Sequence, residues 1–254
     1  MTAILERVPL RSPTVRVLTG VFACLLLLVA LTASANPESN RLQFKLGDET
    51  HVELSTTKIS AQLNSEIVEI FDPHHGKTKR YRGWKLGRVL QLAFGEALGR
   101  DDLTDAVMLA LDGYASVSTK SKLLDEGGYI VYDDLDTSTG WERIGRHEAD
   151  PAPFYLVWSK ESQSTAAGYP WPWQLASISL ITFEQRYPAV VPVDVVKSSP
   201  VHFGYEIFKK RCVRYHAINQ QGGKIGPDLN YPKNILEYRS ASVVRSFIRN
   251  PAAF

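Results

Sequence analysis

The stretch EIVEIFDPHHGKTKRYRGWKLGRVLQLAFGEA (residues 66–97) decides the expected fold, because a strand pattern is followed by a helix pattern. Residues 66–71 predict a strand that ends at Asp72-Pro73, and residues 74–79 predict a polar turn with its bend at Gly76. Apolar side chains then recur at the spacing of one helical stripe: Leu86, Val89, Leu90, Ala93, Phe94 and Ala97. We expect this helix to close a core.

Short apolar runs bounded by Gly, Pro or Asp predict four more buried strands, at residues 106–111, 129–132, 154–158 and 175–183. Strands and helix together predict an α+β domain over residues 36–187. Alternate prolines in YPWPW (residues 169–173) exclude regular structure there, so we expect an ordered loop or a contact surface. Residues 188–202 contain prolines among valines and serines and predict a linker. A second, smaller domain is then expected over residues 203–254.

Residues 1–35 have the pattern of a cleavable signal peptide. Three arginines precede the apolar run of residues 17–31, and Ala33-Ser34-Ala35 provides the small residues of a cleavage site. We therefore expect export to the periplasm with no stable membrane span after cleavage. The alternative is a retained N-terminal anchor, although the apolar run is shorter than the ~20 residues that a membrane-spanning helix needs.

Charge is unevenly distributed after removal of residues 1–35. Residues 203–254 contain nine Lys and Arg against three Asp and Glu, whereas residues 36–202 contain seventeen against twenty-three. The balanced total gives no indication of nucleic-acid binding. The basic C-terminal segment instead predicts a partner with an acidic surface. Cleavage also removes Cys24 and leaves Cys212 as the remaining cysteine, so an intramolecular disulfide is not expected.

The strongest chemical motif is CVRYH (residues 212–216). In a Cys-x-x-Cys-His site, two thiols form thioethers to haem vinyl groups and the adjacent imidazole reaches the iron. Here Cys212 and His216 are in register, and Tyr215 stands in place of the second cysteine. A single thioether is the most that this site can form.

The sequence after this motif, AINQQGGKIGPDL (residues 217–229), resembles that of class I c-type cytochromes down to the Gly-Pro-x-Leu turn. The resemblance spans about residues 203–254 and implies a small all-α domain that binds haem c. It implies that Cys212 is the covalent anchor, that His216 is the proximal iron ligand, and that the backbone near Pro227 accepts a hydrogen bond from the other ring nitrogen of that histidine.

The distal iron ligand is not assigned by the sequence. The family commonly uses a methionine there, but Met1 and Met108 are the two methionines and both precede Cys212. Water, a foreign ligand or His202 are the alternatives. A domain that has lost its cofactor, with Cys212 and His216 in structural roles, is the competing interpretation.

The central residues resemble the molybdopterin-binding fold of sulfite-oxidase-type oxidoreductases. The resemblance covers roughly residues 42–185 and rests on four phrases: DPHHGK (72–77), YRGWKL (81–86), LDGY (111–114) and PFYLVW (153–158). Catalytic members of that family hold molybdenum through a cysteine thiolate, and these residues contain no cysteine. A bound molybdopterin is therefore not expected, and fold alone does not establish enzyme activity.

Two other clusters contain residue types that bind metals. His74 and His75 are adjacent and lack a third ligand at a recognisable spacing. Asp133, Asp134 and Asp136 lack the glycine and spaced carboxylates of a calcium loop, so a solvated turn is expected instead.

Three functions remain open from the sequence: a periplasmic haem-binding electron carrier, a molybdopterin-type oxidoreductase with a fused haem domain, and a cofactor-free binding module. The first is the main prediction, with an electron carrier favoured over an enzyme.

Overall fold

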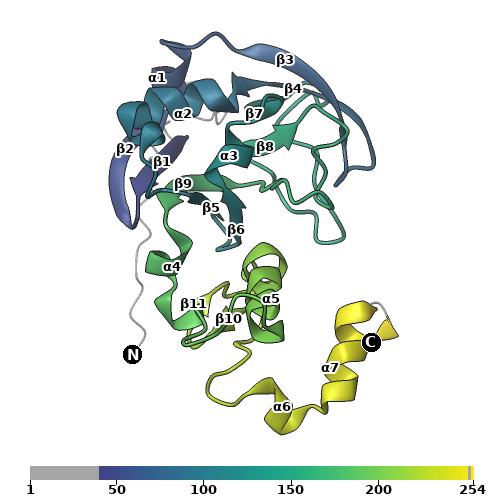
Figure 1. Ribbon diagram of the computed structural model, residues 1–254. Coiled ribbons are helices and arrows are strands. Elements are labelled where there is room, and N and C mark those ends of the chain that lie inside the picture. Colours follow the sequence, from purple (N-terminus) through teal and green to yellow (C-terminus); the bar gives the residue numbers. More distant parts are fainter. Residues whose placement is uncertain (1–39, 251–252) are drawn as a thin grey trace, which may run out of the picture. The chain divides into compact units, whose positions relative to one another are not determined.

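Two β-sheets form the body of the protein in the computed structural model, which describes residues 40–250 and 253–254 (Figure 1). One sheet has five strands in the order β2-β1-β9-β5-β6, and the other has four in the order β3-β4-β7-β8. The strands of the first are β1 (Arg41–Leu46), β2 (Glu49–Ser55), β5 (Asp105–Ala110), β6 (Ala115–Thr119) and β9 (Leu175–Ile181). Those of the second are β3 (Glu66–Asp72), β4 (Lys77–Lys85), β7 (Gly128–Asp134) and β8 (Tyr155–Trp158).

Antiparallel pairing dominates both sheets, and β1 with β9 is the parallel exception. Parallel neighbours need a long crossover, and here most of the central domain lies between these two strands. The five strands predicted from the sequence are all present. The mixed α and β architecture is therefore confirmed, while β1, β2, β4 and β6 were not predicted.

The predicted helix is α2 (Leu86–Phe94), and its apolar stripe is buried. A 3₁₀ turn, η1 (Gly95–Gly99), follows where Gly95 adopts a positive φ of 52°. α2 contacts β2, β4 and β7, so it packs against strands of both sheets. Two shorter helices, α1 (Thr56–Ser60) and α3 (Lys120–Leu123), begin at Ser55 and Thr119, whose hydroxyls accept hydrogen bonds from backbone amides in the first turn.

Strand β5 is buried on both faces and separates two apolar clusters. Ala106 and Met108 point into the larger cluster with α2, whereas Val107 belongs to the second. The second cluster also contains Phe183, Tyr205, Phe208 and Val213 from the chain that follows β9. The uninterrupted apolar run of β5 is thus explained by burial on two sides.

The polar turn predicted over residues 74–79 is shorter than expected, because strand β4 already begins at Lys77. The turn ends at Gly76, with φ of 66°, and residues 77–85 continue as strand. Lys79 points inward with a fully buried side chain, and its Nζ lies 2.8 Å from Asp134 Oδ2 and 2.7 Å from Glu142 Oε2. Burial opposes the charged form of Lys79, but the two carboxylates outweigh it and raise the pKa of the amine.

Each carboxylate of the acidic run at the end of β7 is paired with a cation. Asp134 binds Lys79, Asp136 lies 2.8 Å from Arg80, and Asp133 lies 3.6 Å from Arg82. Each carboxylate therefore faces a cation of the neighbouring strand β4. Asp134, which has no exposed side-chain surface, differs from the expected solvated turn, whereas Asp133 and Asp136 remain partly exposed.

Glu142 is expected to contribute stability that is lost in acid. Hydrogen bonds from Lys77 and then from Lys79 lower the pKa of Glu142 to about 2, against 4.5 for the ordinary carboxyl. Because the folded-state pKa is depressed, the contribution is complete above pH 4.5 and disappears as the pH falls toward 2. We expect the difference in unfolding free energy between wild type and Glu142→Gln to shrink over that interval in urea titrations. A constant difference would contradict this, and Glu161→Gln at an exposed position controls for the loss of a carboxylate.

The chain after β9 consists of short helical elements and one minimal β ladder. In order they are α4 (Phe183–Arg186), η2 (Pro188–Val190), α5 (Pro200–Ile207), the π-helical turn η3 (Phe208–Cys212), β10 (Ala217–Ile218), β11 (Gln221–Gly222), α6 (Ile235–Tyr238) and α7 (Ala241–Arg249). The predicted linker, residues 188–202, thus includes η2 and the beginning of α5. The segment is not purely helical, because β10 and β11 accompany the helices. A small all-α domain therefore stays a prediction.

Polar contacts and apolar packing both join the C-terminal segment to the body. Lys209 Nζ lies 3.2 Å from Asp105 Oδ2 and 3.2 Å from Glu184 Oε1, and it lies over the ring of Phe183 at 4.6 Å. Tyr205 donates to the same Glu184 carboxylate at 2.9 Å. One cation of the basic segment, Lys209, is therefore neutralised by carboxylates of the same chain.

Residues 169–173 form the predicted ordered loop. Trp158 Nε1 donates to the carbonyl of Pro170 at 2.6 Å, and Trp171 Nε1 donates to that of Gln163 at 3.1 Å. Within the described residues, no helix is long and apolar enough to cross a membrane. The predicted signal peptide and Cys24 lie outside the part of the chain that the structure describes.

Candidate functional site

Helix α5 and the turn η3 lead into the Cys212–His216 motif. Ser199 begins α5 by accepting a hydrogen bond from the His202 amide, and Pro200 occupies the first turn, where no amide is needed. The helix then continues as the π-helical turn η3, which ends at Cys212. The amides of Tyr215 and His216 both donate to the carbonyl of Cys212, at 3.0 and 2.9 Å. This closed turn holds the thiol and the imidazole on one short piece of backbone.

The ring of His216 is fixed by a hydrogen bond between Nδ1 and the carbonyl oxygen of Pro227, at 2.8 Å. A carbonyl only accepts, so Nδ1 is the donor and Nε2 keeps its lone pair. Metal-binding histidines generally have this arrangement, in which the second ring nitrogen donates to a carbonyl or carboxylate. The contact between His216 and Pro227 that the cytochrome resemblance implies is therefore present.

The loop that supplies Pro227 folds through a two-residue hairpin. Ala217 pairs with Gly222 and Ile218 with Gln221, and the residues between them, Asn219 and Gln220, have φ of 52° and 68°. Positive φ at both central positions is typical of the tight turns that join antiparallel strands.

Asp228 closes the same loop. Its carboxylate accepts from the amides of Gln220, Asn230 and Tyr231 at 2.6 to 2.9 Å. Burial opposes the charge of Asp228, but these backbone hydrogen bonds outweigh it and lower the pKa of the carboxyl. Pro227 is thus held between a hairpin and a set of charge-assisted hydrogen bonds.

Two glycines permit the close approach of this loop to the motif. A Cβ on Gly226 would lie 2.6 Å from Cε1 and 2.7 Å from Nδ1 of His216. A Cβ on Gly223 would lie 2.7 Å from backbone atoms of Arg214 and Tyr215. Any larger residue at Gly226 would displace the imidazole. These roles were not predicted from the sequence, although the Gly-rich run after His216 is the signal for them.

Cys212 and Tyr215 differ in their surroundings. Cys212 is a half-buried free thiol that packs against the second apolar cluster. Burial raises the pKa of this thiol, while the neighbouring charge of Arg214 acts in the opposite direction. Tyr215, at the position of the second haem cysteine, packs against the ring of Tyr114 with centroids 5.4 Å apart. Burial and Tyr114 raise the pKa of the Tyr215 hydroxyl.

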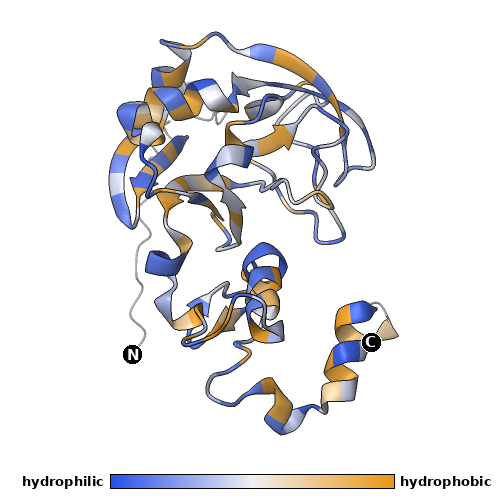
Figure 2. Cartoon of the chain, viewed as in Figure 1, coloured by the Kyte–Doolittle hydropathy of each residue, from blue (hydrophilic) through white to orange (hydrophobic). Residues whose placement is uncertain are grey.

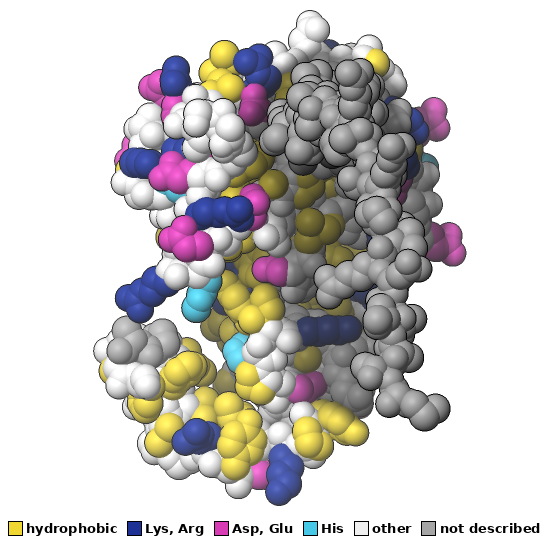
Figure 3. Space-filling view, turned by 180° about the vertical axis from the view of Figure 1, so that it is seen from behind, with side chains coloured by type: hydrophobic (Ala, Val, Ile, Leu, Met, Phe, Trp, Pro, Cys, Tyr) yellow, Lys and Arg dark blue, Asp and Glu magenta, His cyan; other side chains and the backbone are white. Residues whose placement is uncertain are grey.

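The C-terminal segment that contains the motif exposes many large apolar side chains. None of the residues of α6 and α7 is buried, although both helices carry apolar side chains beside polar ones (Figure 2). Hydrophobic side chains gather on this segment in the lower part of Figure 3. The exposed set is Phe203, Ile207, Ile225, Tyr231, Leu236, Tyr238, Val243, Phe247 and Ile248, each between 38% and 74% exposed.

The two adjacent histidines of the central domain lie in the turn between β3 and β4. His74 and His75 follow Asp72, whose Oδ1 accepts from their backbone amides at 2.8 and 3.3 Å. Among the described residues, no group of three or more His, Cys, Asp or Glu side chains is arranged to hold a metal ion. The carboxylate of Asp72 is instead occupied by the hydroxyls of Tyr81 and Tyr155, at 2.8 and 3.3 Å.

Comparisons with known proteins give little further guidance. The chain matches no protein-family profile and no curated protein. Among solved structures, it is similar to the crystal structure of the sulfane dehydrogenase SoxCD from Paracoccus pantotrophus, with 11% sequence identity and a TM-score of 0.39. The match covers 58% of this chain and 39% of that one. A similarity of this size does not establish an activity.

Proposed function

We propose that the protein is an exported haem-binding protein of the electron-transfer type, in which Cys212 anchors haem c and His216 ligates its iron. The observation that carries this proposal is the hydrogen bond from His216 Nδ1 to the Pro227 carbonyl. It directs the lone pair of Nε2 outward and fixes the tautomer that a metal requires.

The donor set and the surface chemistry fit a haem. The His216 imidazole lies four residues after a free thiol, and the same C-terminal segment exposes apolar side chains on α5, α6 and α7. A flat apolar macrocycle would cover part of that surface. The favourable free energy of such burial is about 25 cal/mol per Å² of apolar area. The same side chains would exclude water from the iron.

The residues of this chain have distinct tasks in the proposed site. The Cys212 thiol would add across a vinyl double bond, with sulfur bonding to one carbon and the proton passing to the other, so that no oxidant is consumed. Pro227 would orient His216 and increase the basicity of its Nε2. A bound haem supplies a one-electron couple between ferric and ferrous iron. The distal ligand is not assigned.

Export to the periplasm through cleavage of residues 1–35 belongs to the same proposal, as does a redox partner with an acidic surface. Retention by an uncleaved N-terminal anchor is the alternative location. Lys209 is engaged by Asp105 and Glu184, so the partner would meet the other basic side chains of the segment. Charge of one sign near a redox site accelerates encounter with a partner of opposite charge.

Titration of the unloaded chain with haemin is expected to show saturable binding at one haem per chain, followed by the rise of the Soret band. Replacing His216 by alanine removes the proposed iron ligand and is expected to weaken binding at least tenfold, equivalent to about 1.4 kcal/mol or more. His147→Ala, at an exposed position of the central domain, serves as the matched control. Equal affinities for these two variants would contradict the assignment of His216.

The second candidate, a molybdopterin-type oxidoreductase, is favoured by the resemblance of residues 42–185 to that fold. The donor chemistry does not fit, because those residues contain no cysteine to ligate molybdenum. Metal analysis of protein purified from a host that makes the cofactor would separate the two: stoichiometric molybdenum would support the oxidoreductase. A cofactor-free binding module would show cooperative melting and no affinity for haemin.

A further inference from the structure

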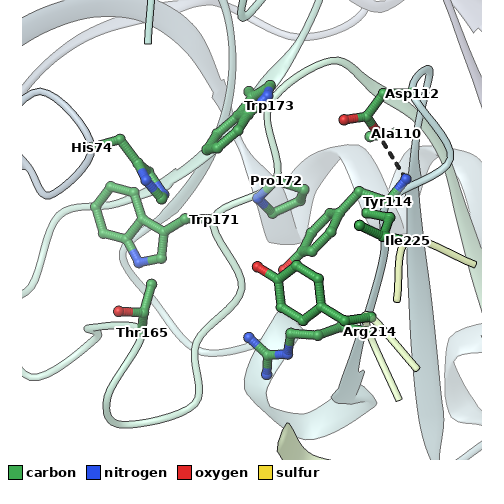
Figure 4. Close-up of a pocket in the computed structure, with 11 residues that line it drawn as sticks. His74, Ala110, Asp112, Tyr114, Thr165, Trp171, Pro172, Trp173, Arg214 and Ile225 are labelled. Atoms are coloured by element: carbon green, nitrogen blue, oxygen red, sulfur yellow. Dashed lines mark hydrogen bonds between the residues drawn. The ribbon is translucent and has the colours of Figure 1, made fainter. Parts of the chain in front are cut away.

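A cavity of about 370 Å³ lies beside the Cys212–His216 turn and is separate from the proposed haem ligands (Figure 4). Its volume is in the range of small-molecule sites. Four remote parts of the chain line it. They contribute His74 after β3, Tyr114 before β6, Trp171 and Trp173 before β9, and Arg214 with Tyr215. None of these residues has a part in the proposed ligation of iron.

Five aromatic rings line the cavity, those of His74, Tyr114, Trp171, Trp173 and Tyr215. His74 and Trp173 meet edge to face, with ring centroids 4.8 Å apart, and Tyr114 packs beside Tyr215 at 5.4 Å. Trp171 is buried and held by its hydrogen bond to Gln163. Figure 4 shows His74 and Trp171 on one side of the space and Tyr114 on the other. Rings that are held in place lose little entropy on binding and favour a planar guest.

The polar groups of the cavity are few and are incompletely satisfied. The Arg214 guanidinium donates to the backbone carbonyl of Lys210 at 2.9 Å. Within the described residues, no carboxylate lies at ion-pair distance from it. The Nε2 atom of His74 is buried and has no hydrogen-bond partner among those residues. Asp112 also lines the cavity, and its Oδ1 accepts from the Tyr114 amide at 2.8 Å.

A buried imidazole nitrogen without a partner is costly unless a ligand satisfies it. The half-buried Arg214 guanidinium has no carboxylate partner among the described residues and is available to an anion. Burial lowers the pKa of His74, which leaves its ring neutral near pH 7 and able to share one hydrogen bond. The required guest therefore has a flat ring system for the aromatic walls, an anionic group for Arg214 and a hydrogen-bonding atom for His74.

We propose that this cavity binds a planar aromatic carboxylate of one or two rings, with the carboxylate on Arg214 and the ring between the tryptophan and tyrosine walls. The inference does not depend on haem binding, because it uses none of the proposed iron ligands. It gives Tyr215 a role of its own as part of the cavity wall. Arg214 and Tyr215 lie between Cys212 and His216, so an occupied cavity contacts the same turn as the proposed haem.

Isothermal titration of the full chain with sodium 2-naphthoate tests the proposal. We expect saturable binding at one site per chain. Two related probes separate the contributions: 2-naphthalenemethanol has the rings without the charge, and cyclohexanecarboxylate has the charge without the rings. Each is expected to bind at least tenfold more weakly than 2-naphthoate. Absence of saturable binding, or equal binding of either analogue, would overturn the proposal.

Variants locate the site. Arg214→Gln removes a charge-assisted hydrogen bond and is expected to weaken 2-naphthoate binding about tenfold or more. His74→Phe keeps an aromatic ring, loses the nitrogen and is expected to weaken binding about threefold or more. Arg245→Gln, on the exposed surface of α7, is the matched control and should bind as wild type does. Circular dichroism and melting confirm folding, and equal affinity of the folded Arg214→Gln and Arg245→Gln chains would place the ligand elsewhere.

Discussion

Replacing Lys79 by methionine is expected to lower the free energy of unfolding by about 3–5 kcal/mol, because it leaves an uncompensated charge in the interior. Methionine preserves most of the side-chain volume, so the loss reports charge rather than a cavity. The carboxylate of Asp134 has no exposed surface. Its Oδ2 atom would lose the ammonium and keep the hydrogen bond from the Glu142 amide at 3.1 Å. Urea denaturation at pH 7 measures the effect.

Lys77→Met is the matched control for this prediction. Lys77 also binds Glu142, at 2.7 Å, but its side chain is 54% exposed. An exposed ion pair contributes about 0–1 kcal/mol, so this variant should remain near wild type. If Lys79→Met lowers the free energy of unfolding no more than Lys77→Met does, the buried pair of Lys79 and Asp134 does not stabilise the sheet. The double variant Lys79→Met with Asp134→Leu should recover part of the loss, because both charges are then removed.

Replacing Cys212 by serine is expected to abolish covalent retention of haem. A hydroxyl does not form the thioether, and Tyr215 occupies the place of the second thiol. Protein made with export and haem-maturation machinery is denatured, extracted with acidified organic solvent and assayed as the pyridine haemochrome. Wild type should retain one haem per chain after extraction, and Cys212→Ser should retain none. Retention by Cys212→Ser would contradict the assignment of the anchor.

The variant Tyr215→Cys provides the complementary test. It restores Cys-x-x-Cys-His and removes a ring that packs against Tyr114. With the second vinyl group also saturated, the haemochrome band is expected to lie at shorter wavelength than that of wild type. An unchanged band would show that the thiol at position 215 does not reach the haem.

Hydrophobic periodicity predicted the helices and strands that bury one regular set of apolar side chains. The helix α2 and the strands β3, β5, β7 and β8 bury apolar side chains at regular spacing, so their patterns survive in the sequence. Strand β4 escaped prediction because charged residues dominate it. Its inward-facing Lys79 is stabilised by carboxylates more than fifty residues away in the chain, and no local pattern records such a partner.

The two candidate sites also differ in how much of each could be predicted from the sequence. The contact between His216 and Pro227 spans eleven residues and was implied by the resemblance to class I c-type cytochromes. The aromatic cavity joins His74, Tyr114, Trp173 and Arg214, which are brought together only by the sheet order and by the packing of η3 on the body. The proline-rich loop of residues 169–173 indicated an ordered contact surface, but its partners could not be identified without the tertiary fold.

The most direct test of the haem proposal is the intact mass of the exported wild-type chain, recorded under denaturing conditions after production with haem-maturation machinery. We predict the mass of residues 36–254 plus one covalently bound haem, with the addition localised by fragmentation to Cys212. A homogeneous, folded chain that carries no haem, and that also fails to bind haemin in titration, would contradict the account.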